Sequence, residues 1–228
     1  MSIKENILRV REAVETVKAK KGLTQKVALC AATKTRSLEE IKEALRGGVD
    51  IVGENRIQEA REKYPFISEA NRHFIGHLQK NKIKYTFDLF SCIQSVDSIE
   101  LLRALDLAAV KRDREMDLFI EVNIAGEESK YGFPPDRAEE IMEEAAECER
   151  VRITGLMTML PLTDNEILLH RKAAEAYRLY ETFRYWNNGK NIAVDWLSMG
   201  MSQDFLIAVE EGSNLIRIGT ALFGERGI

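Results

Sequence analysis

The sequence has few of the residues that mark secreted, metal-binding or membrane proteins. Its three cysteines, Cys30, Cys92 and Cys148, are widely spaced and form neither a disulfide framework nor a paired metal spacing. No apolar run approaches the roughly 20 residues of a membrane-spanning helix. The first six residues carry charge at once and lack the apolar core of a signal peptide. We therefore expect a soluble, cytoplasmic protein.

An excess of charge is also missing. The chain has 33 basic and 37 acidic residues, a formal net charge of −4 at pH 7, which argues against nucleic acid or an anionic membrane as the main partner. It has only four prolines and no linker rich in serine and glycine. Its 228 residues suit one barrel-sized domain with a large core. We expect a single domain over residues 1–228, and a monomer.

Strand-like and helix-like segments alternate along the chain. A leading helix is predicted over residues 2–20, where Ile3, Ile7 and Val10 recur at helical spacing. The predicted strands are short apolar runs, at 27–33, 49–53, 73–76, 89–95, 117–123, 152–159, 193–199 and 215–218. Among the helices between them, one opens with the capping box at 37–40, and others span 99–110, 136–148 and 165–186.

Eight strands separated by helices indicate parallel strands joined by crossovers. This repeat number predicts an α/β fold, a closed (β/α)8 TIM barrel with an extra N-terminal helix, whose typical length is about 250 residues. A doubly wound open sheet is the alternative. In a barrel, function gathers at the carboxyl ends of the strands, so the residues that end each strand become the candidate site.

Lys34 directly follows the first predicted strand, and Arg217 lies at the end of the last one, one residue before its final position. If the barrel closes, these strands are neighbours, and the amine faces the guanidinium and the small residues Gly219 and Thr220. That set can hold an aldehyde-bearing, phosphorylated pyridine such as pyridoxal 5′-phosphate (PLP): the lysine supplies an imine, the turn binds phosphate, and the arginine reaches the ring nitrogen. A lysine that merely reaches water, and a Schiff-base aldolase acting on a sugar phosphate, remain alternatives.

Two turns of small residues follow the last two predicted strands, at 198–202 and 219–220. Barrels commonly bind phosphate in these loops, through backbone N–H groups and hydroxyls. Ordinary capping turns are the alternative.

For Arg217 the alternative is an ion pair with Glu54 or Asp195. A guanidinium that faces a pyridine nitrogen disfavours ring protonation, which suits a holder of the cofactor at least as well as a versatile catalyst.

Other polar residues receive more modest predictions. Asn55 could reach a ring oxygen, whereas Arg56 and Glu59 are expected on a solvated helix face. His73 and His77 would share one face of a strand at a separation of about 13 Å, too far for one metal ion, so we expect no metal site. Two methionines of the turn after the seventh strand are expected to line the pocket, namely Met199 and Met201.

The chain also resembles a known family. The motifs that carry the resemblance cover most of the sequence in collinear order, and include residues 33–35, 53–59, 73–82, 197–204 and 217–224. They resemble the PLP homeostasis protein family (the YggS/PROSC group), which is similar to the barrel domain of alanine racemase. The resemblance implies PLP held as an imine on Lys34, Arg217 at the ring nitrogen, and a phosphate surrounded by Ser198, Ser202, Gly219 and Thr220. The expected cofactor-binding residues are Lys34, Asn55, Ser198, Met199, Gly200, Ser202, Arg217, Gly219 and Thr220.

The resemblance implies a PLP carrier that stores, buffers or delivers the cofactor, with PLP-requiring apoenzymes as partners and no robust catalysis. The alternative is a racemase-like PLP enzyme of amino-acid metabolism. A racemase needs acid/base groups on both faces of the α-carbon. Lys34 could serve one face, and the sequence offers no obvious residue for the other. Since it ends at Ile228, soon after the eighth predicted strand, we expect no further β domain, and no catalytic residues are assigned.

Overall fold

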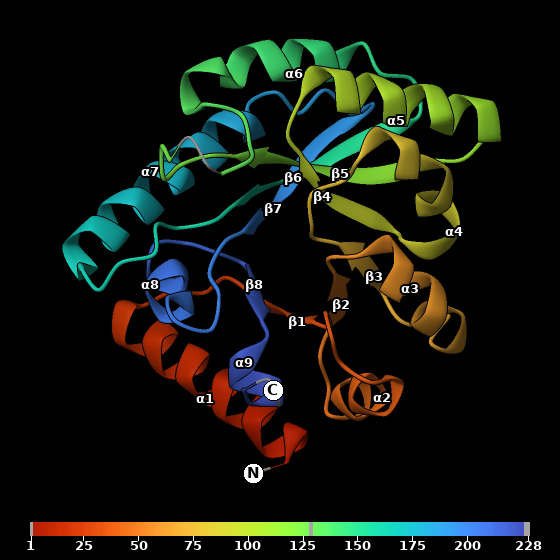
Figure 1. Ribbon diagram of the computed structural model, residues 1–228. Coiled ribbons are helices and arrows are strands. Elements are labelled where there is room, and N and C mark those ends of the chain that lie inside the picture. Colours follow the sequence, from red (N-terminus) through yellow and green to blue (C-terminus); the bar gives the residue numbers. More distant parts are fainter. Residues whose placement is uncertain (1, 128–129, 226–228) are drawn as a thin grey trace.

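The apolar runs of the sequence pair in chain order into a closed barrel of parallel strands (Figure 1). The computed structural model describes residues 2–127 and 130–225. This closure confirms the predicted barrel, and the doubly wound alternative is wrong. The strands are β1 (Ala28–Ala32), β2 (Ile51–Glu54), β3 (Arg72–Phe74), β4 (Cys92–Val96), β5 (Met116–Val122), β6 (Val151–Thr158), β7 (Ile192–Ser198) and β8 (Leu215–Ile218).

The barrel closes where the first and last strands meet, as predicted. Cys30 of β1 lies opposite Arg217 of β8, and Ala31 lies opposite Ile218. The pairing of β7 with β8 continues past the end of β7, because the Arg217 N–H donates to the Gly200 carbonyl at 2.9 Å. The carboxyl ends of β1, β7 and β8 therefore lie side by side.

Helices surround the barrel on its outside (Figure 1). They are α1 (Ile3–Lys21), α2 (Leu38–Arg46), α3 (Ile57–Lys63), α4 (Thr86–Leu89), α5 (Ile99–Arg112), α6 (Ala138–Ala146), α7 (Glu166–Arg184), α8 (Phe205–Glu210) and α9 (Thr220–Phe223), with 3-10 turns η1 (Tyr64–Phe66), η2 (Lys80–Tyr85) and η3 (Pro135–Arg137). Ser37 forms the predicted capping box with Glu40, and Ser98 caps α5. The predicted fourth strand began too early, since Leu89 ends α4 and the strand begins at Cys92. No helix in the described ranges combines the length and apolarity that crossing a membrane requires.

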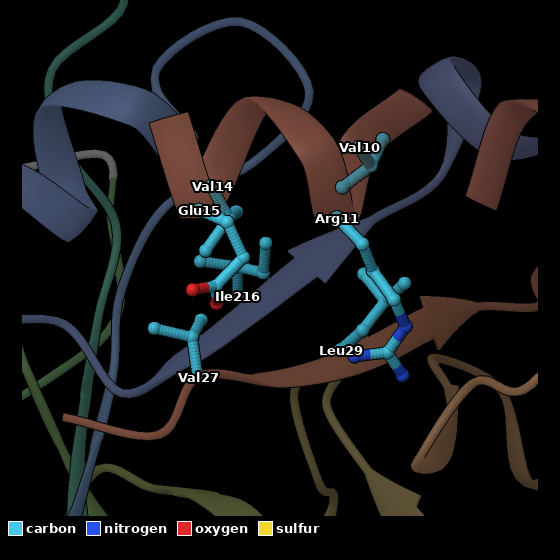
Figure 2. Close-up of a pocket in the computed structure, with 7 residues that line it drawn as sticks. All are labelled: Val10, Arg11, Val14, Glu15, Val27, Leu29 and Ile216. Carbon is cyan, nitrogen blue, oxygen red and sulfur yellow. The ribbon is translucent and has the colours of Figure 1, made fainter. Parts of the chain in front are cut away.

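The leading helix α1 covers the seam between β1 and β8. Ser2 caps its start, and the buried Asn6 side chain donates to the Leu222 carbonyl of α9 at 2.8 Å. Beneath the helix lies a cavity of about 100 Å³. Its lining comes from α1 and the two strands of the seam, namely Val10, Arg11, Val14, Glu15, Val27, Leu29 and Ile216 (Figure 2).

The side chains that face the barrel interior form two layers, because successive residues of a strand point to opposite faces. The apolar layer is made of Ala28, Cys30, Ile51, Cys92, Phe119, Met157 and Leu215. Toward the carboxyl ends lies the polar layer, made of His73, Gln94, Glu121, Ser198 and Arg217, all buried. The polar layer forms the floor beneath the candidate site.

Candidate functional site

Lys34 lies at the rim of the barrel, two residues past the end of β1. It has the same parity as Ala28 and Cys30, which face the interior. Its side chain is exposed at the mouth. A Cβ added to Gly219 would lie 3.6 Å from the Ala32 Cβ, so the turn after β8 meets the end of β1 just below Lys34. The structure therefore brings the predicted lysine to the predicted turn.

Arg217 lies in the polar layer with 5% of its surface exposed. One nitrogen, Nη1, donates to the hydroxyl and the carbonyl of Ser198, both at 2.7 Å, and Nη2 donates to the Thr158 carbonyl at 2.8 Å. Within the described ranges it makes no ion pair with Glu54 or Asp195, so that alternative is wrong. Burial lowers the pKa of Arg217 from its ordinary value, but a guanidinium remains charged in proteins. A fixed, buried cation therefore lies beneath the mouth.

A chain of hydrogen bonds orients this cation. The Ser198 hydroxyl, which accepts from Arg217, donates to Gln94 Oε1 at 2.6 Å. Gln94 Nε2 lies 2.7 Å from His73 Nδ1. Burial lowers the pKa of His73 to about 3, so its ring is neutral and Nδ1 can accept from the amide. The four side chains form one continuous array, which fixes the guanidinium across the barrel.

The sequence predicts that His73 and His77 share one face of a strand. They do not, because β3 ends at Phe74. His77 Nδ1 lies 2.9 Å from Asp97 Oδ2, and the His77 ring stacks on Tyr131 at 3.8 Å between centroids. The two histidines are therefore in different surroundings, one in the polar layer and one at the rim. Across the described residues, no cluster of three or more His, Cys, Asp or Glu side chains could hold a metal ion.

The turn after β7 places its residues in different surroundings. Ser198 turns its hydroxyl to Arg217, and Met199 packs its side chain into the core between barrel and helices. The Met199 N–H and carbonyl are bonded to Leu215 and Ser213, so we drop Met199 from the predicted site. Gly200 has φ +100° and lies so close to α8 that an added Cβ would be 2.7 Å from the Ala208 Cβ. Only glycine allows this turn without a shift of the helix.

A hydrogen bond joins the two turns of small residues. The Ser202 hydroxyl accepts from the Ala221 N–H at 3.2 Å, so the β7–α8 turn contacts the start of α9. Gly219 is the N-cap of α9 and Thr220 its first residue, and N–H groups at a helix start have no acceptor within the helix. The two turns that were expected to surround a phosphate are therefore neighbours at the mouth.

Asn55 follows β2 at the rim and is half-buried. Its main-chain N–H donates to Glu54 Oε1 at 2.7 Å. Its side-chain oxygen Oδ1 is buried and has no hydrogen-bond partner among the described atoms. A buried acceptor without a partner costs about 1–3 kcal/mol, and a ligand group can remove that cost. Asn55 therefore remains a candidate for ligand contact.

Two acidic residues, Glu59 and Glu121, lie in more buried surroundings than the sequence indicated. Glu59, expected on a solvated face, is only 18% exposed in its side chain and accepts from the Thr35 N–H at 2.7 Å. Glu121 lies in the polar layer, where burial and nearby Asp97 raise its pKa to about 7 against the opposing charge of Arg217. Strand alternation could have found Glu121, which lies two residues from inward-facing Phe119.

Comparison with known proteins shows similarity over nearly the whole chain. The family model "Alanine racemase, N-terminal domain" matches residues 2–227. The chain is 37% identical to the pyridoxal phosphate homeostasis protein of Aquifex aeolicus, covering 99% of both sequences. It is 31% identical to that of Escherichia coli, covering 98% of this chain and 97% of the relative.

Solved structures show the same similarity. The structure of PipY from Synechococcus elongatus with PLP bound is 31% identical, with a TM-score of 0.83 over 98% of this chain and all of that one. An alanine racemase from Clostridium difficile shares 14% identity, with a TM-score of 0.77 over 98% of this chain and 57% of the racemase. At that identity the racemase supports the fold alone.

Proposed function

Because this chain belongs to the pyridoxal phosphate homeostasis protein family and carries the alanine racemase N-terminal domain, we propose that it binds PLP as a Schiff base on Lys34. The observation that carries the proposal is the pairing of β1 with β8, which joins the lysine-bearing rim to the buried Arg217. When bound, PLP supplies an aldehyde that reacts reversibly with amines. The proposed role is intracellular PLP homeostasis by storage, buffering or delivery to PLP-requiring apoenzymes.

The surrounding residues fit such a ligand. Ser202, Gly219 and Thr220 offer a hydroxyl and N–H groups to a phosphate at the joined turns. Arg217 lies at the floor, where it can face the ring nitrogen, and Asn55 offers its unpartnered amide oxygen. We assign Ser198 to the orientation of Arg217, because its hydroxyl already contacts the guanidinium.

The same arrangement favours a carrier over a catalyst. Ser198 and Thr158 hold the charged guanidinium in place. A cation beside the ring nitrogen disfavours ring protonation, and an unprotonated ring withdraws electrons weakly. We therefore propose no robust catalysis, and expect the PLP-loaded protein to exchange the α-proton of alanine in D₂O no faster than free PLP does. Faster exchange with racemisation, followed by NMR and chiral chromatography, would favour the racemase-like enzyme instead.

An absorption spectrum tests the proposal directly. Wild-type protein mixed with PLP should develop a visible band that borohydride bleaches, and peptide mapping should then locate the reduced label on Lys34. Lys34→Ala should show no such band. A wild-type protein without the band, or a label on another lysine, would remove the assignment.

A further inference from the structure

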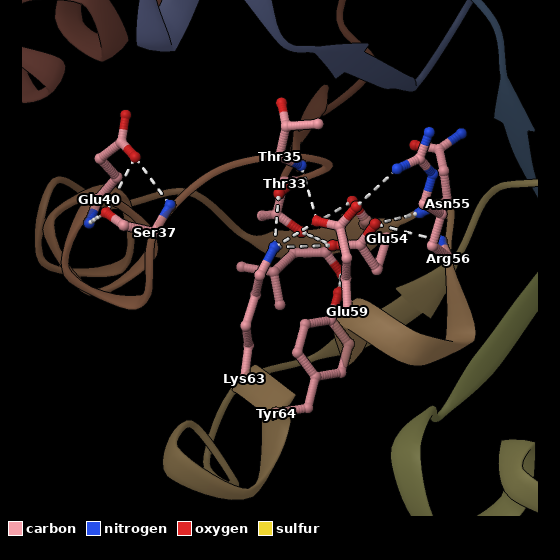
Figure 3. A network of polar contacts seen from close by, with 12 residues as sticks. Thr33, Thr35, Ser37, Glu40, Glu54, Asn55, Arg56, Glu59, Lys63 and Tyr64 are labelled. Carbon is pink, nitrogen blue, oxygen red and sulfur yellow. Dashed lines mark hydrogen bonds and ion pairs between the residues drawn. The ribbon is translucent and has the colours of Figure 1, made fainter. Parts of the chain in front are cut away.

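The turn that carries Lys34 has an unusual backbone. Thr35, directly after the lysine, has φ +64°, in the left-handed region that favours glycine. A β-branched residue is strained there, and such a conformation persists only where the surroundings hold it. The hold is visible, since the Thr35 N–H donates to Glu59 Oε2 of α3 at 2.7 Å (Figure 3).

Glu59 is itself fixed by Lys63, one helical turn further along α3. Lys63 Nζ lies 2.5 Å from Glu59 Oε2, and the side chains of both are largely buried, at 13% and 18% exposure. The same ammonium group lies 3.5 Å from the Thr33 carbonyl. Lys63 therefore links the carboxylate that holds Thr35 to the residue on the other side of Lys34.

A second carboxylate completes the network. Glu54, fully buried at the end of β2, accepts from the Thr33 hydroxyl at 3.1 Å and lies 3.6 Å from Lys63 Nζ. Its other oxygen accepts from the Asn55 N–H. Figure 3 shows the result, in which two carboxylates bridged by one ammonium hold both neighbours of Lys34.

The network is costly if it serves stability alone. Burial raises the pKa of Glu54, although the charge of Lys63 opposes this. Burial also acts to raise the pKa of Glu59, but the bonds from Lys63 and Thr35 outweigh it and lower the pKa below 4.5. Taking paired charges out of water seldom stabilises a fold more than apolar packing would, whereas a satisfied polar network does fix a local geometry.

We infer that Glu59 is a positioning residue, which acts through Thr35 and Lys63 to hold the turn at residues 33–35 in the shape that presents the Lys34 amine to the aldehyde of PLP. The inference rests on the proposed function. Glu59 would thus affect the formation of the imine between Lys34 and PLP. It would not affect the binding of the phosphate or of the ring.

Two ligands separate these steps. The probes are PLP and 4′-deoxypyridoxine 5′-phosphate, in which a methyl group replaces the aldehyde, so that only non-covalent binding remains. Glu59→Ala should slow the appearance of the visible band by about 10- to 100-fold, the usual effect of a small misplacement of a reacting group. Its affinity for the deoxy analogue, measured by calorimetry, should equal that of wild type.

Two further variants serve as conservative replacement and control. Glu59→Gln keeps an oxygen that can accept from Thr35 but loses the charge that pairs with Lys63, so its rate should lie between those of wild type and Glu59→Ala. Glu62→Ala removes an exposed carboxylate from the same helix and should leave the rate unchanged. If Glu59→Ala does not fold, as judged by circular dichroism, the comparison between Glu59→Gln and Glu62→Ala decides the question.

Wild-type band-formation rates in the folded Glu59 variants would overturn the inference. An equal loss of affinity for PLP and for its deoxy analogue would also overturn it, because the network would then shape the whole pocket. A wild-type protein that binds the analogue but forms no band on Lys34 would instead overturn the proposed function.

Discussion

The two layers of the barrel interior come from the same strands but are built differently. Phe119 in the apolar layer is followed two residues later by Glu121 in the polar layer, and Leu215 is followed by Arg217. All four are at most 5% exposed. An apolar side chain gains free energy from leaving water, whereas a charged one loses hydration that its partners only partly replace. We conclude that the apolar layer stabilises the barrel, and that the polar layer gives up stability to form the floor of the site.

The largest effect should come from a cavity in the apolar layer. Phe119→Ala should lower the free energy of unfolding by about 3–5 kcal/mol, because it removes a buried ring without a replacement. Phe66→Ala, at a site that is 65% exposed, is the matched control and should change it by less than about 0.5 kcal/mol. Urea denaturation measures both. Similar losses in the two variants would mean that the apolar layer does not carry the stability assigned to it.

Glu121 makes the contribution of the polar layer to the free energy of unfolding depend on pH. Its pKa of about 7 in the fold exceeds the ordinary 4.5, so the folded protein holds the proton more tightly than the unfolded chain. The stability that the tighter proton binding provides is complete below pH 4.5 and is lost as the pH rises through about 7. The loss amounts to about 3 kcal/mol, at about 1.4 kcal/mol per unit of difference between the two pKa values.

Replacing the carboxyl group should remove this dependence. In denaturation experiments from pH 5 to pH 8.5, Glu121→Gln should flatten the decline in the free energy of unfolding that wild type shows. Glu62→Gln changes an exposed carboxyl group on α3 and should leave the decline in place. A wild-type stability that is constant or rises over this range would show that Glu121 is ionised without cost in the fold.

Arg217→Met converts part of the polar layer into an apolar one. The affinity for PLP should fall by about 10- to 100-fold, as expected for the loss of a charged hydrogen bond worth about 1.5–3 kcal/mol. The unfolding temperature without ligand should change little, because removing the buried charge offsets the loss of the bonds to Ser198 and Thr158. Arg103→Met removes an arginine whose side chain is 65% exposed and serves as the control. A destabilised Arg217→Met that still binds PLP like wild type would reverse the roles of the two layers.

The elements of the barrel were predictable because each rests on local patterns, and its closure followed from the number of strand and helix repeats. Apolar strand runs and the capping box at Ser37 each act within a few residues. The start of β4 was not predictable in the same way, since Leu89 and Phe90 are apolar like the strand that follows and Leu89 serves equally well in a helix. The proximity of the two candidate residues, Lys34 and Arg217, followed from the closure of the barrel.

The residues that hold the site in shape were harder to find. Glu59 and Lys63 are four apart on a helix, which from the sequence looks like an ordinary exposed ion pair. The contact that gives Glu59 its place is to Thr35, 24 residues earlier in the chain, and no local pattern reports it. Ser198 was expected near phosphate, but its contact with Arg217 depends on the registration of β7 against β8.

The smallest effect concerns the seam outside the barrel, where apolar packing is incomplete. Val14 of α1, buried, lines the cavity of about 100 Å³ above β1 and β8. Val14→Ile adds one methylene group that can enter this space, and should raise the free energy of unfolding by about 0.5–1 kcal/mol. The same change at Val110, which is 40% exposed on α5, should have little effect. A loss of stability in Val14→Ile would mean that α1 cannot admit the added group without moving away from β1 and β8. The packing between α1 and these strands would then already be as tight as their shape allows.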